Sequence, residues 1–589
     1  MKRLNTSMTS GPLLPNIILY TIPIILTSIL QLLFNAADLI IVGRFCGSVS
    51  VAAVGATGSI TNLMVNFFIG LSVGAGVTVA HGLGSRAENV VHNTVHTALP
   101  TALVSGVVLT AVGVSFSETF LRWMGTPDTV LPLSALYMKI YFAGITFTMV
   151  YNFSAAILRA AGDTKSPLIF LSFAGVVNVV LNVVFVTVFH MNVAGVALAT
   201  TISQGISAIL VVWALMKRTD ACRLELKKMH FHPAQLSKIL RIGLPAGIQS
   251  SLFSISNVLI QSSINSFGDV FMSGNAAAAN IEGFVYVTIN SFQQSAQNFI
   301  GQNAGARQYK RVSQTLWICL GCVAVVGVAL GSLGYFFGPS LLSLYITDSQ
   351  EAIGYGMIRL SIICLTYCIC GLMDVSTGAL RGIGESFIPM VISVLGVCGI
   401  RIGWIYTIFQ IPQFHTPQCL YISYPVSWAI TFLCQVIAFL LGPFTKLTDR
   451  LNAILRPSEE AMQDRDFFEK STVLTLYTIA GAISALANND SISRISADYT
   501  VDGDISLGIK DTAYITLRVC DKHFTTIKQR CENPRAIMEF ADLDLAAGLF
   551  AGNVSTINEM CKGTIYLRGM ISMLDNVNRI LDRVSVYLG

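Results

Sequence analysis

The sequence predicts an all-α polytopic membrane protein: twelve transmembrane helices in two parallel-repeat six-helix bundles, followed by a small soluble α+β domain. Of 589 residues, 53% are hydrophobic and 12% are charged, and the mean hydropathy is +0.65. One soluble core could not bury so many apolar side chains. Segments of the first half recur in the second, and the composition turns polar after Pro457. We therefore expect bundles at 1–222 and 223–445, a linker at 446–465 and a domain at 466–589.

Twelve apolar runs are long enough to cross a hydrocarbon layer about 30 Å thick. The N-terminal segment before the first run is short and polar, and no small-residue cleavage site follows it, so we expect it to be retained. The predicted spans are 15–42, 51–80, 92–115, 133–158, 166–189, 192–216, 239–267, 272–300, 312–338, 354–380, 388–411 and 419–442.

Lysine and arginine residues are concentrated in alternate loops. Seven lie in the segment 216–241 and seven more in the other loops after even-numbered spans, whereas loops after odd-numbered spans show only Arg44 and Arg122. Short basic loops remain in the cytoplasm. We therefore expect both termini and the C-terminal domain on the cytoplasmic side of the plasma membrane. The net charge of +5 follows from this topology and does not indicate a nucleic-acid partner.

An internal repeat explains why two loops resemble each other. ILRAAGDTKSP at 157–167 is echoed by ALRGIGESFIP at 379–389, and the same 222-residue shift pairs Pro23 with Pro245. A shift of 221 pairs GSR at 84–86 with GAR at 305–307. Six crossings return the chain to its starting side, so the two copies have the same orientation. A cleft between them could open to either face, which is typical of transporters; duplication for assembly alone is the alternative.

Several motifs resemble the multidrug and toxic compound extrusion (MATE) family. They are PIILTSILQLLFNAADLIIVGRFCG, AAVGATGSI and ILRAAGDTKSP in the first half, and IGLPAGIQSS, NFIGQNAGAR and ALRGIGES in the second. The resemblance implies antiport of protons or sodium ions against small organic, often cationic, substrates, without ATP. No GxxxxGK[ST] phosphate loop is present, which agrees with this. The cysteines lie mostly within apolar runs without partner histidines, so we expect no metal or redox site. The resemblance to a transporter family implies no enzymatic activity and no cofactor.

An ionisable side chain within hydrocarbon is a candidate functional residue, because it is costly unless paired or hydrated. Asp38 stands within the first span, and Asn35 shares much of its helical face. The family resemblance implies that Asp38 is the coupling residue, able to take up and release a proton. Neighbouring amides that merely satisfy this carboxylate are the structural alternative.

Three more polar residues belong to the predicted site of the first half. Asn178 and Asn182 are four residues apart and share a helical face. The resembling branch typically has aspartate at the second position, so Asn182, which cannot titrate, departs from the pattern. Thr200 matches a polar position of the same cavity, although a threonine in a helix often bonds to its own backbone.

The second half offers two carboxylates, Glu282 and Asp374, with Arg401 as a possible partner for one of them. A structural ion pair is as good an explanation as a cation site.

The repeated loops have a mechanical interpretation. We expect Arg159 and Arg381 to end helices at the anionic cytoplasmic leaflet, and the loop glycines to permit left-handed turns before the next helix.

The residues after 457 have the pattern of a soluble domain. The run 471–487 is short for a span and is expected to be an amphipathic helix, with a thirteenth crossing as the alternative. The stretches RISADYTV, DISLGI, AYITLRVC and FTTIKQ, which begin at residues 494, 504, 513 and 524, predict an antiparallel four-stranded sheet.

The segment from ENPRAIMEF to the last helix resembles the sterol-carrier-protein-like fold. It contains the NP turn, a helix ending LxxGN, and a strand of the form GxIxLxG. The resemblance implies an apolar tunnel for a lipid or another hydrophobic ligand, although core packing is the simpler role for each residue. The predicted lipid-binding residues are Leu549, Phe550, Met560, Leu567 and Leu574, with Leu545, Ile557 and Met570 beside them.

Three functions remain open at this stage. The leading one is a cation-coupled exporter of organic compounds, with membrane lipid and a hydrophobic ligand as further partners. The second is a flippase for lipids or lipid-linked precursors. The third, of another class, is a membrane sensor that does not transport.

Overall fold

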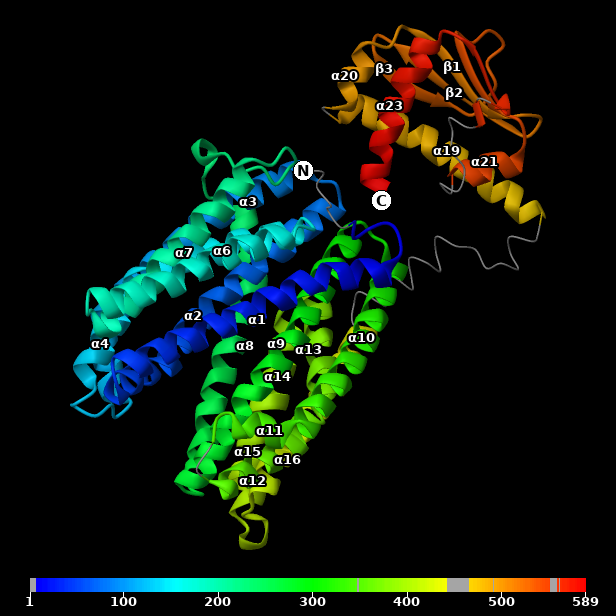
Figure 1. The fold of residues 1–589 in the computed structure, drawn as a ribbon. Coiled ribbons are helices and arrows are strands. Elements are labelled where there is room, and N and C mark those ends of the chain that lie inside the picture. Colours follow the sequence, from blue (N-terminus) through cyan, green and yellow to red (C-terminus); the bar gives the residue numbers. More distant parts are fainter. Residues whose placement is uncertain are drawn as a thin grey trace. The chain divides into compact units, whose positions relative to one another are not determined.

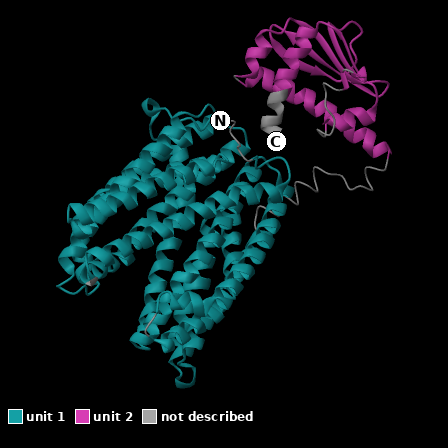
Figure 2. Ribbon diagram, viewed as in Figure 1, with its two compact units in different colours: residues 1–446 teal, residues 447–589 magenta. Residues whose placement is uncertain are grey.

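The computed structural model describes residues 7–346, 349–441, 465–490, 492–550, 559–560 and 562–588. The chain divides into two compact units, residues 1–446 and 447–589 (Figure 2). The expected linker at 446–465 lies almost wholly outside the described residues. The first unit is helical, and the second combines helices with a sheet (Figure 1).

The N-terminal half of the first unit consists of long helices that follow the predicted runs. Two of them are interrupted: α4 meets α5 at a bend of 46°, and α6 continues into a π-helical segment. The elements are α1 (Leu13–Phe45), α2 (Ser48–Gly84), α3 (Glu88–Trp123), α4 (Leu131–Ala143), α5 (Ile145–Ala160), α6 (Lys165–Val183), η1 (Val184–Val188), α7 (Asn192–Met216) and η2 (Leu226–Lys228).

The C-terminal half repeats this arrangement. Its first two helices have 33 and 37 residues, the same lengths as α1 and α2. The elements are α8 (Pro233–Asn265), α9 (Asp269–Gly305), α10 (Tyr309–Phe336), α11 (Gly338–Ser343), α12 (Gln350–Arg359), η3 (Leu360–Cys364), α13 (Tyr367–Gly382), α14 (Phe387–Ser393), η4 (Val394–Gly399), α15 (Ile400–Tyr406), η5 (Ile408–Gln410), η6 (Pro412–Phe414) and α16 (Pro417–Leu441).

The exact number of spans is not settled by length and apolarity. Nine helices in the described part of the chain could cross a membrane, or up to eleven if each bent pair is one span. α8 and α9 fall outside this set despite their length, because serine, asparagine and glutamine side chains lower their hydropathy. Arg465–Asn489 belongs to the set, but its apolar residues pack against the sheet of the second unit. Twelve crossings stay a prediction.

The repeated turns have the predicted geometry. Gly162 and Gly384 have φ values of 84° and 94°, in the left-handed region that favours glycine. In each turn the residue after the glycine donates its backbone N–H back to the helix, Asp163 to Leu158 and Glu385 to Leu380. The two copies therefore share one helix-ending motif, as expected from the sequence.

Glycines allow α2 and α8 to pack closely and so join the two halves. A Cβ atom at Gly70 would lie 2.3 Å from the backbone nitrogen of Gly247, and one at Gly247 would lie 2.2 Å from the carbonyl oxygen of Phe67. Because the neighbouring atoms are backbone, a side chain could be accommodated only if the helices moved apart.

We expect Gly70→Ala to lower the stability of the first unit by about 1–3 kcal/mol, the usual cost of overpacking. Thermal unfolding of the purified chain measures this. Gly58→Ala is the matched control on the same helix, because a Cβ there meets no atom within 4 Å. A Gly70→Ala variant as stable as Gly58→Ala would contradict the close-packing interpretation.

The second unit contains a five-stranded sheet of order β3-β2-β1-β4-β5. β1 pairs parallel with β4, and the other pairs are antiparallel. The elements are α19 (Arg465–Asn489), α20 (Ser493–Asp498), β1 (Gly503–Ile509), β2 (Ala513–Cys520), β3 (His523–Ile527), β4 (Ala536–Phe540), α21 (Leu543–Phe550), β5 (Ile565–Gly569) and α23 (Ile571–Leu588).

Two expectations for this unit were wrong. The sheet is mixed, and the stretch RISADYTV forms α20 and the turn after it. Asp490 accepts hydrogen bonds from the backbone nitrogen of Ser493 at 2.8 Å and from its hydroxyl at 2.7 Å. This side chain satisfies a donor at the beginning of the helix, a local signal that outweighs the alternating pattern. The strands predicted from residues 504, 513 and 524 are present as β1, β2 and β3.

Candidate functional site

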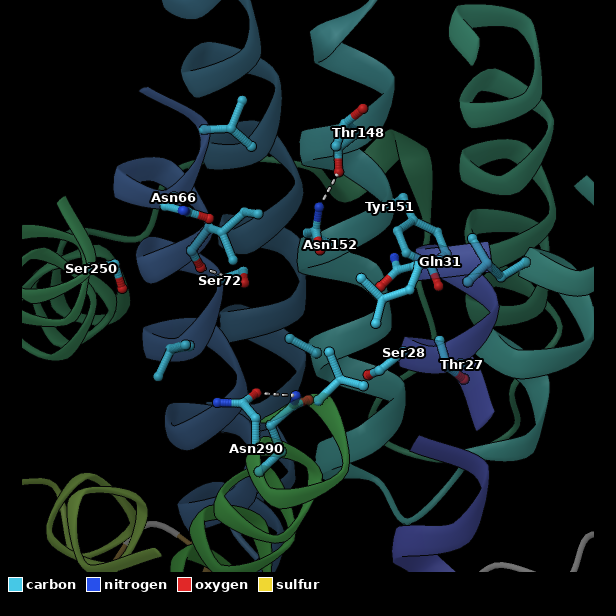
Figure 3. A pocket seen from close by; sticks show the side chains of 18 of the residues that line it. Thr27, Ser28, Gln31, Asn66, Ser72, Thr148, Tyr151, Asn152, Ser250 and Asn290 are labelled. Carbon is cyan, nitrogen blue, oxygen red and sulfur yellow. Dashed lines mark hydrogen bonds between the residues drawn. The ribbon is translucent and has the colours of Figure 1, made fainter. Parts of the chain in front are cut away.

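A central cavity of about 610 Å³ lies between the two halves of the first unit. Its walls come from α1, α2, α5, α6 and α7 on one side and from α8, α9 and α13 on the other. Figure 3 shows part of this wall, where Gln31, Asn66, Asn152 and Asn290 are labelled. Amide side chains are the most frequent polar groups of the lining. The charged lining residues among those described are Asp38, Arg159, Asp374 and Arg381.

Asp38 is the centre of a polar cluster in the N-terminal half. Its Oδ1 accepts a hydrogen bond from the amide of Asn182, and its Oδ2 lies 3.4 Å from the Thr200 hydroxyl. The single proton of that hydroxyl is shared with the Val196 carbonyl oxygen of the same helix, at 3.0 Å, as the sequence alternative expected. The Asn182 amide also donates to Asn178 Oδ1 at 3.2 Å, and Asn178 donates to Thr200 at 3.4 Å. The structure therefore brings together four residues that the sequence singled out. Their role in coupling stays a prediction.

The fifth of these residues, Asn35, lines the same cavity, and its side chain is exposed. It has no hydrogen bond in the described cluster around Asp38. Asn35 and Gln31 are one turn apart on α1 and face the cavity with it. They face the cavity and do not hold the carboxylate.

Gly175 sets the distance between α6 and α1. A Cβ atom at this position would lie 1.8 Å from the Phe34 ring, so the ring packs directly on the glycine and would have to move for a larger residue. Asn178 and Asn182 follow Gly175 by three and seven residues and lie on the same face of α6. The small residue therefore directs both amides at α1, where Asp38 stands. The π-helical turn η1 begins two residues after Asn182, and such turns often mark functional sites.

Glu282 is fully engaged in an ion pair, the structural alternative stated from the sequence, but its partner is Arg359, which the sequence interpretation did not name. Arg359 donates to both carboxylate oxygens, at 2.9 and 2.8 Å, and also to Asn275 at 2.6 Å. The Tyr421 hydroxyl donates to the same Asn275 oxygen at 2.9 Å. The pair is buried between α9 and α12, with side-chain exposures of 10% and 4%. Arg401, named as a possible partner, is not part of it. This geometry favours a structural role for Glu282.

Asp374 on α13 has a different environment. It lines the central cavity, and its Oδ2 has no hydrogen-bond partner among the described residues. Arg381 stands two turns later on the same helix, but it donates to Gln249 Oε1 at 2.8 Å. A carboxylate in a cavity wall with an unpartnered oxygen is available for a cation or a proton.

The positions of Arg159 and Arg381 correct an expectation. Both were expected at the cytoplasmic leaflet, but both line the central cavity, and Arg381 is only 7% exposed. The repeat explains this, because equivalent helices place equivalent arginines at the same end of one shared cavity. Their charges balance those of Asp38 and Asp374, so the charged lining is not dominated by acidic groups.

Two hydrogen bonds join the halves at the ends of α2 and α9. His81 Nε2 lies 2.6 Å from the Gly382 carbonyl oxygen, and the Gln302 amide donates to the Ala160 carbonyl at 2.7 Å. His81 and Gln302 are 221 residues apart, and Ala160 and Gly382 are 222 apart, so the repeat relates one bond to the other. We call these four residues the clasp.

Both halves of the first unit match a known protein family. The MatE family model matches residues 23–184 and again residues 245–407. The chain belongs to the MatE family. The two matches begin 222 residues apart, which confirms the internal repeat. The MatE chain is a multi-pass membrane transporter and not an enzyme.

Known proteins resemble the MatE chain over most of the first unit. "Probable multidrug resistance protein YpnP" of Bacillus subtilis is 28% identical over 399 residues, 67% of this chain and 88% of the relative. The "FAD transporter" of Shewanella oneidensis is 24% identical over 324 residues, 54% of this chain and 71% of the relative.

Solved structures share the fold of this MatE chain. One described as an outward-facing multidrug resistance MATE family transporter has a TM-score of 0.70 at 21% identity, covering 76% of this chain and all of that one. A transporter from Pyrococcus furiosus, whose title reports reverse polarity of the binding pocket, has a TM-score of 0.67 at 22% identity. It covers 78% of this chain and all of that one.

The family match ends before the second unit of the MatE chain, so the sterol-carrier-like resemblance is not confirmed. Leu574 is buried in the core of that unit, whereas Leu549, Phe550 and Leu567 pack partly buried against it. Met560 is 38% exposed. Ile557 lies outside the described residues. This is the packing of an ordinary core and its rim, and a lipid-binding role for these residues stays a prediction.

Proposed function

We propose that the chain exports small organic compounds by cation-coupled antiport, with Asp38 as the coupling residue. The observation that supports the proposal is the environment of the Asp38 carboxylate. It lines the central cavity and is held by Asn182 and Thr200, and it has no ion-pair partner within 4.0 Å among the described residues. Proton binding and cargo binding would thus compete in one cavity. The curated relatives with multidrug names support the substrate class.

A proton suits the cluster better than a sodium ion does. Both side chains that contact Asp38 donate hydrogen bonds to it, whereas a hard cation needs several converging oxygen ligands. Among the described residues there is no group of three or more histidine, cysteine, aspartate or glutamate side chains that could hold a metal ion. We therefore propose proton coupling, with sodium as the alternative that experiment must exclude.

A gradient-jump assay tests this function. The full chain is reconstituted in liposomes, and uptake of a fluorescent organic cation is followed after a pH jump or a sodium jump of equal size. We expect uptake after the pH jump only. Uptake after the sodium jump but not after the pH jump would show that sodium is the coupling ion. Scrambling of labelled lipid without uptake would favour a flippase, and the absence of both would favour a sensor.

The clasp supports alternating access between the two halves. It joins the ends of the helices that lead into the basic loops, expected on the cytoplasmic side. The ribbons of the two halves separate toward the opposite ends (Figure 1). We propose that the halves rock about the glycine contact of α2 and α8, and that the clasp opens when the cavity faces the cytoplasm.

We expect loss of the clasp to favour the cytoplasm-open state. The double variant His81→Ala, Gln302→Ala removes two hydrogen bonds worth about 0.5–1.5 kcal/mol each. Hydrogen exchange of the segments 160–163 and 382–385 should then increase relative to the wild type. Gln261→Ala is the control, because that exposed side chain bonds only within α8, to Asn265. Unchanged exchange in both segments would show that the clasp does not hold the closed state.

The second unit supplies a second candidate function, the binding of a hydrophobic ligand. The resemblance of the segment from ENPRAIMEF to the last helix to the sterol-carrier-protein-like fold supports it. If the module only regulates, deletion of 458–589 should leave proton-driven uptake of a soluble dye within about twofold, since the central cavity lies wholly within the first unit. Complete loss of uptake by a folded truncated chain would show that the module is required for transport.

A further inference from the structure

A second cavity of about 610 Å³ lies mainly in the C-terminal half and adjoins the central cavity, with which it shares six lining residues, Asn66, Ser250, Phe253, Tyr286, Asn290 and Asp374. Asp374 lines both cavities. The Glu282–Arg359 ion pair forms part of the second lining, together with Arg401 of α15 and the aromatic side chains of α16. The proposed transport function assigns no role to this cavity.

Arg401 is held rigidly in the wall of the second cavity. The residue is 4% exposed, and its Nε donates to the Ser427 hydroxyl at 2.9 Å. The guanidinium lies 4.0 Å from the ring centre of Tyr424 and 5.5 Å from that of Trp428. Stacking of this kind stabilises a cation, but it leaves the in-plane N–H groups free. Nη2 has no hydrogen-bond partner among the described residues.

The charge of Arg401 is not neutralised by a carboxylate in the described part of the chain. Glu282 has both oxygens occupied by Arg359. Asp374 lines the same cavity but forms no ion pair with Arg401 within 4.0 Å.

Arginine keeps its positive charge in proteins. A buried charge without a partner costs several kcal/mol, and such residues within membrane proteins almost always face a partner or a hydrated path. Arg401 lines a cavity large enough for an organic ligand, and its buried Nη2 has no hydrogen-bond partner among the described residues; together these indicate a missing anion.

We propose that the second cavity binds a monovalent anion at Arg401, either chloride or the carboxylate group of an organic ligand. The planar guanidinium suits a carboxylate, which can accept two parallel hydrogen bonds from it. Chloride would satisfy the charge with less directional contact. The proposal does not depend on the proposed export function, because binding can be measured without transport.

Binding is tested on the purified full chain in lipid nanodiscs, at constant ionic strength with sulfate as the background anion. Chloride and benzoate are the probes. The readouts are tryptophan fluorescence, since Trp428 adjoins the guanidinium, and the midpoint of thermal unfolding. We expect a saturable change in both for the wild type. Arg401→Gln should weaken the apparent affinity at least tenfold, and Arg44→Gln, which removes an exposed arginine, should match the wild type.

Each outcome decides the matter. Saturation by chloride alone identifies an inorganic ion as the ligand, and saturation by benzoate alone identifies an organic carboxylate. Trp428→Phe should reduce the fluorescence change but keep the thermal shift. No saturation with either probe, or equal affinity in wild type and Arg401→Gln, overturns the proposal. If Arg401→Gln does not fold, Arg401→Lys replaces it, with an expected loss of affinity for benzoate because the planar pair of donors is gone.

Discussion

Asp38→Asn is expected to reduce pH-driven uptake in proteoliposomes to the level of liposomes without protein. The substitution keeps the size of the side chain and its hydrogen-bonding capacity beside Asn182 and Thr200, but the site can no longer bind and release a proton. Cargo binding should survive, because the substitution leaves the many amide side chains of the cavity lining in place. Uptake after the pH jump and equilibrium binding of the same dye are the two measurements.

Controls separate coupling from folding. Asp128→Asn removes a carboxylate from an exposed position, with a side-chain exposure of 94%, and should transport like the wild type. Asn182→Asp places a second carboxylate against Asp38, so that the two groups share a proton and the pH dependence of uptake changes. Wild-type uptake by Asp38→Asn would show that the proton is carried elsewhere, with Asp374 as the next residue to test.

The N-terminal site was predictable because its signals are local and repeat at helical spacing. Asn178 and Asn182 lie on one face of α6 whatever the rest of the chain does. The position of Asp38 within an apolar run restricted it to a span. The sequence could not show that Gly175 and Phe34 set the distance between α6 and α1, because that contact joins residues far apart in the chain.

The C-terminal half was less predictable, because its charged groups find partners across helices. Arg359 was overlooked although it donates hydrogen bonds to both carboxylate oxygens of Glu282. Arg381 was expected at the leaflet because it follows an apolar run, but it bonds to Gln249 of α8 within the cavity. The periodicity of the sequence predicts on which face of a helix a residue lies. What that face contacts depends on tertiary packing.

The second unit shows the limits of alternation as a signal. Three predicted strands are present, and their apolar residues form the core with α19 and α23. The remaining predicted strand, RISADYTV, contains the helix α20 instead. Asp490 accepts a hydrogen bond from the backbone nitrogen of Ser493 at the beginning of that helix. The parallel pairing of β1 with β4 depends on a connection through the whole of β2 and β3, which no local pattern encodes.

Removal of the Arg359 side chain should have the largest effect on stability. Arg359→Ala leaves Glu282 buried and unpaired, so we expect a loss of about 3–5 kcal/mol in the free energy of unfolding. Asn275 would also lose the donor that bonds to its side-chain oxygen at 2.6 Å. Thermal and denaturant unfolding of the purified chain measure the loss.

A double-mutant cycle then distinguishes a structural pair from a transport site. Replacing both partners, as in Glu282→Leu with Arg359→Met, should restore much of the stability lost in Arg359→Ala, because no unpaired charge remains. If the pair serves only the fold, this double variant should also keep pH-driven uptake. A stable double variant without uptake would instead give Glu282 a part in transport, since the fold would be intact while the carboxylate was missing.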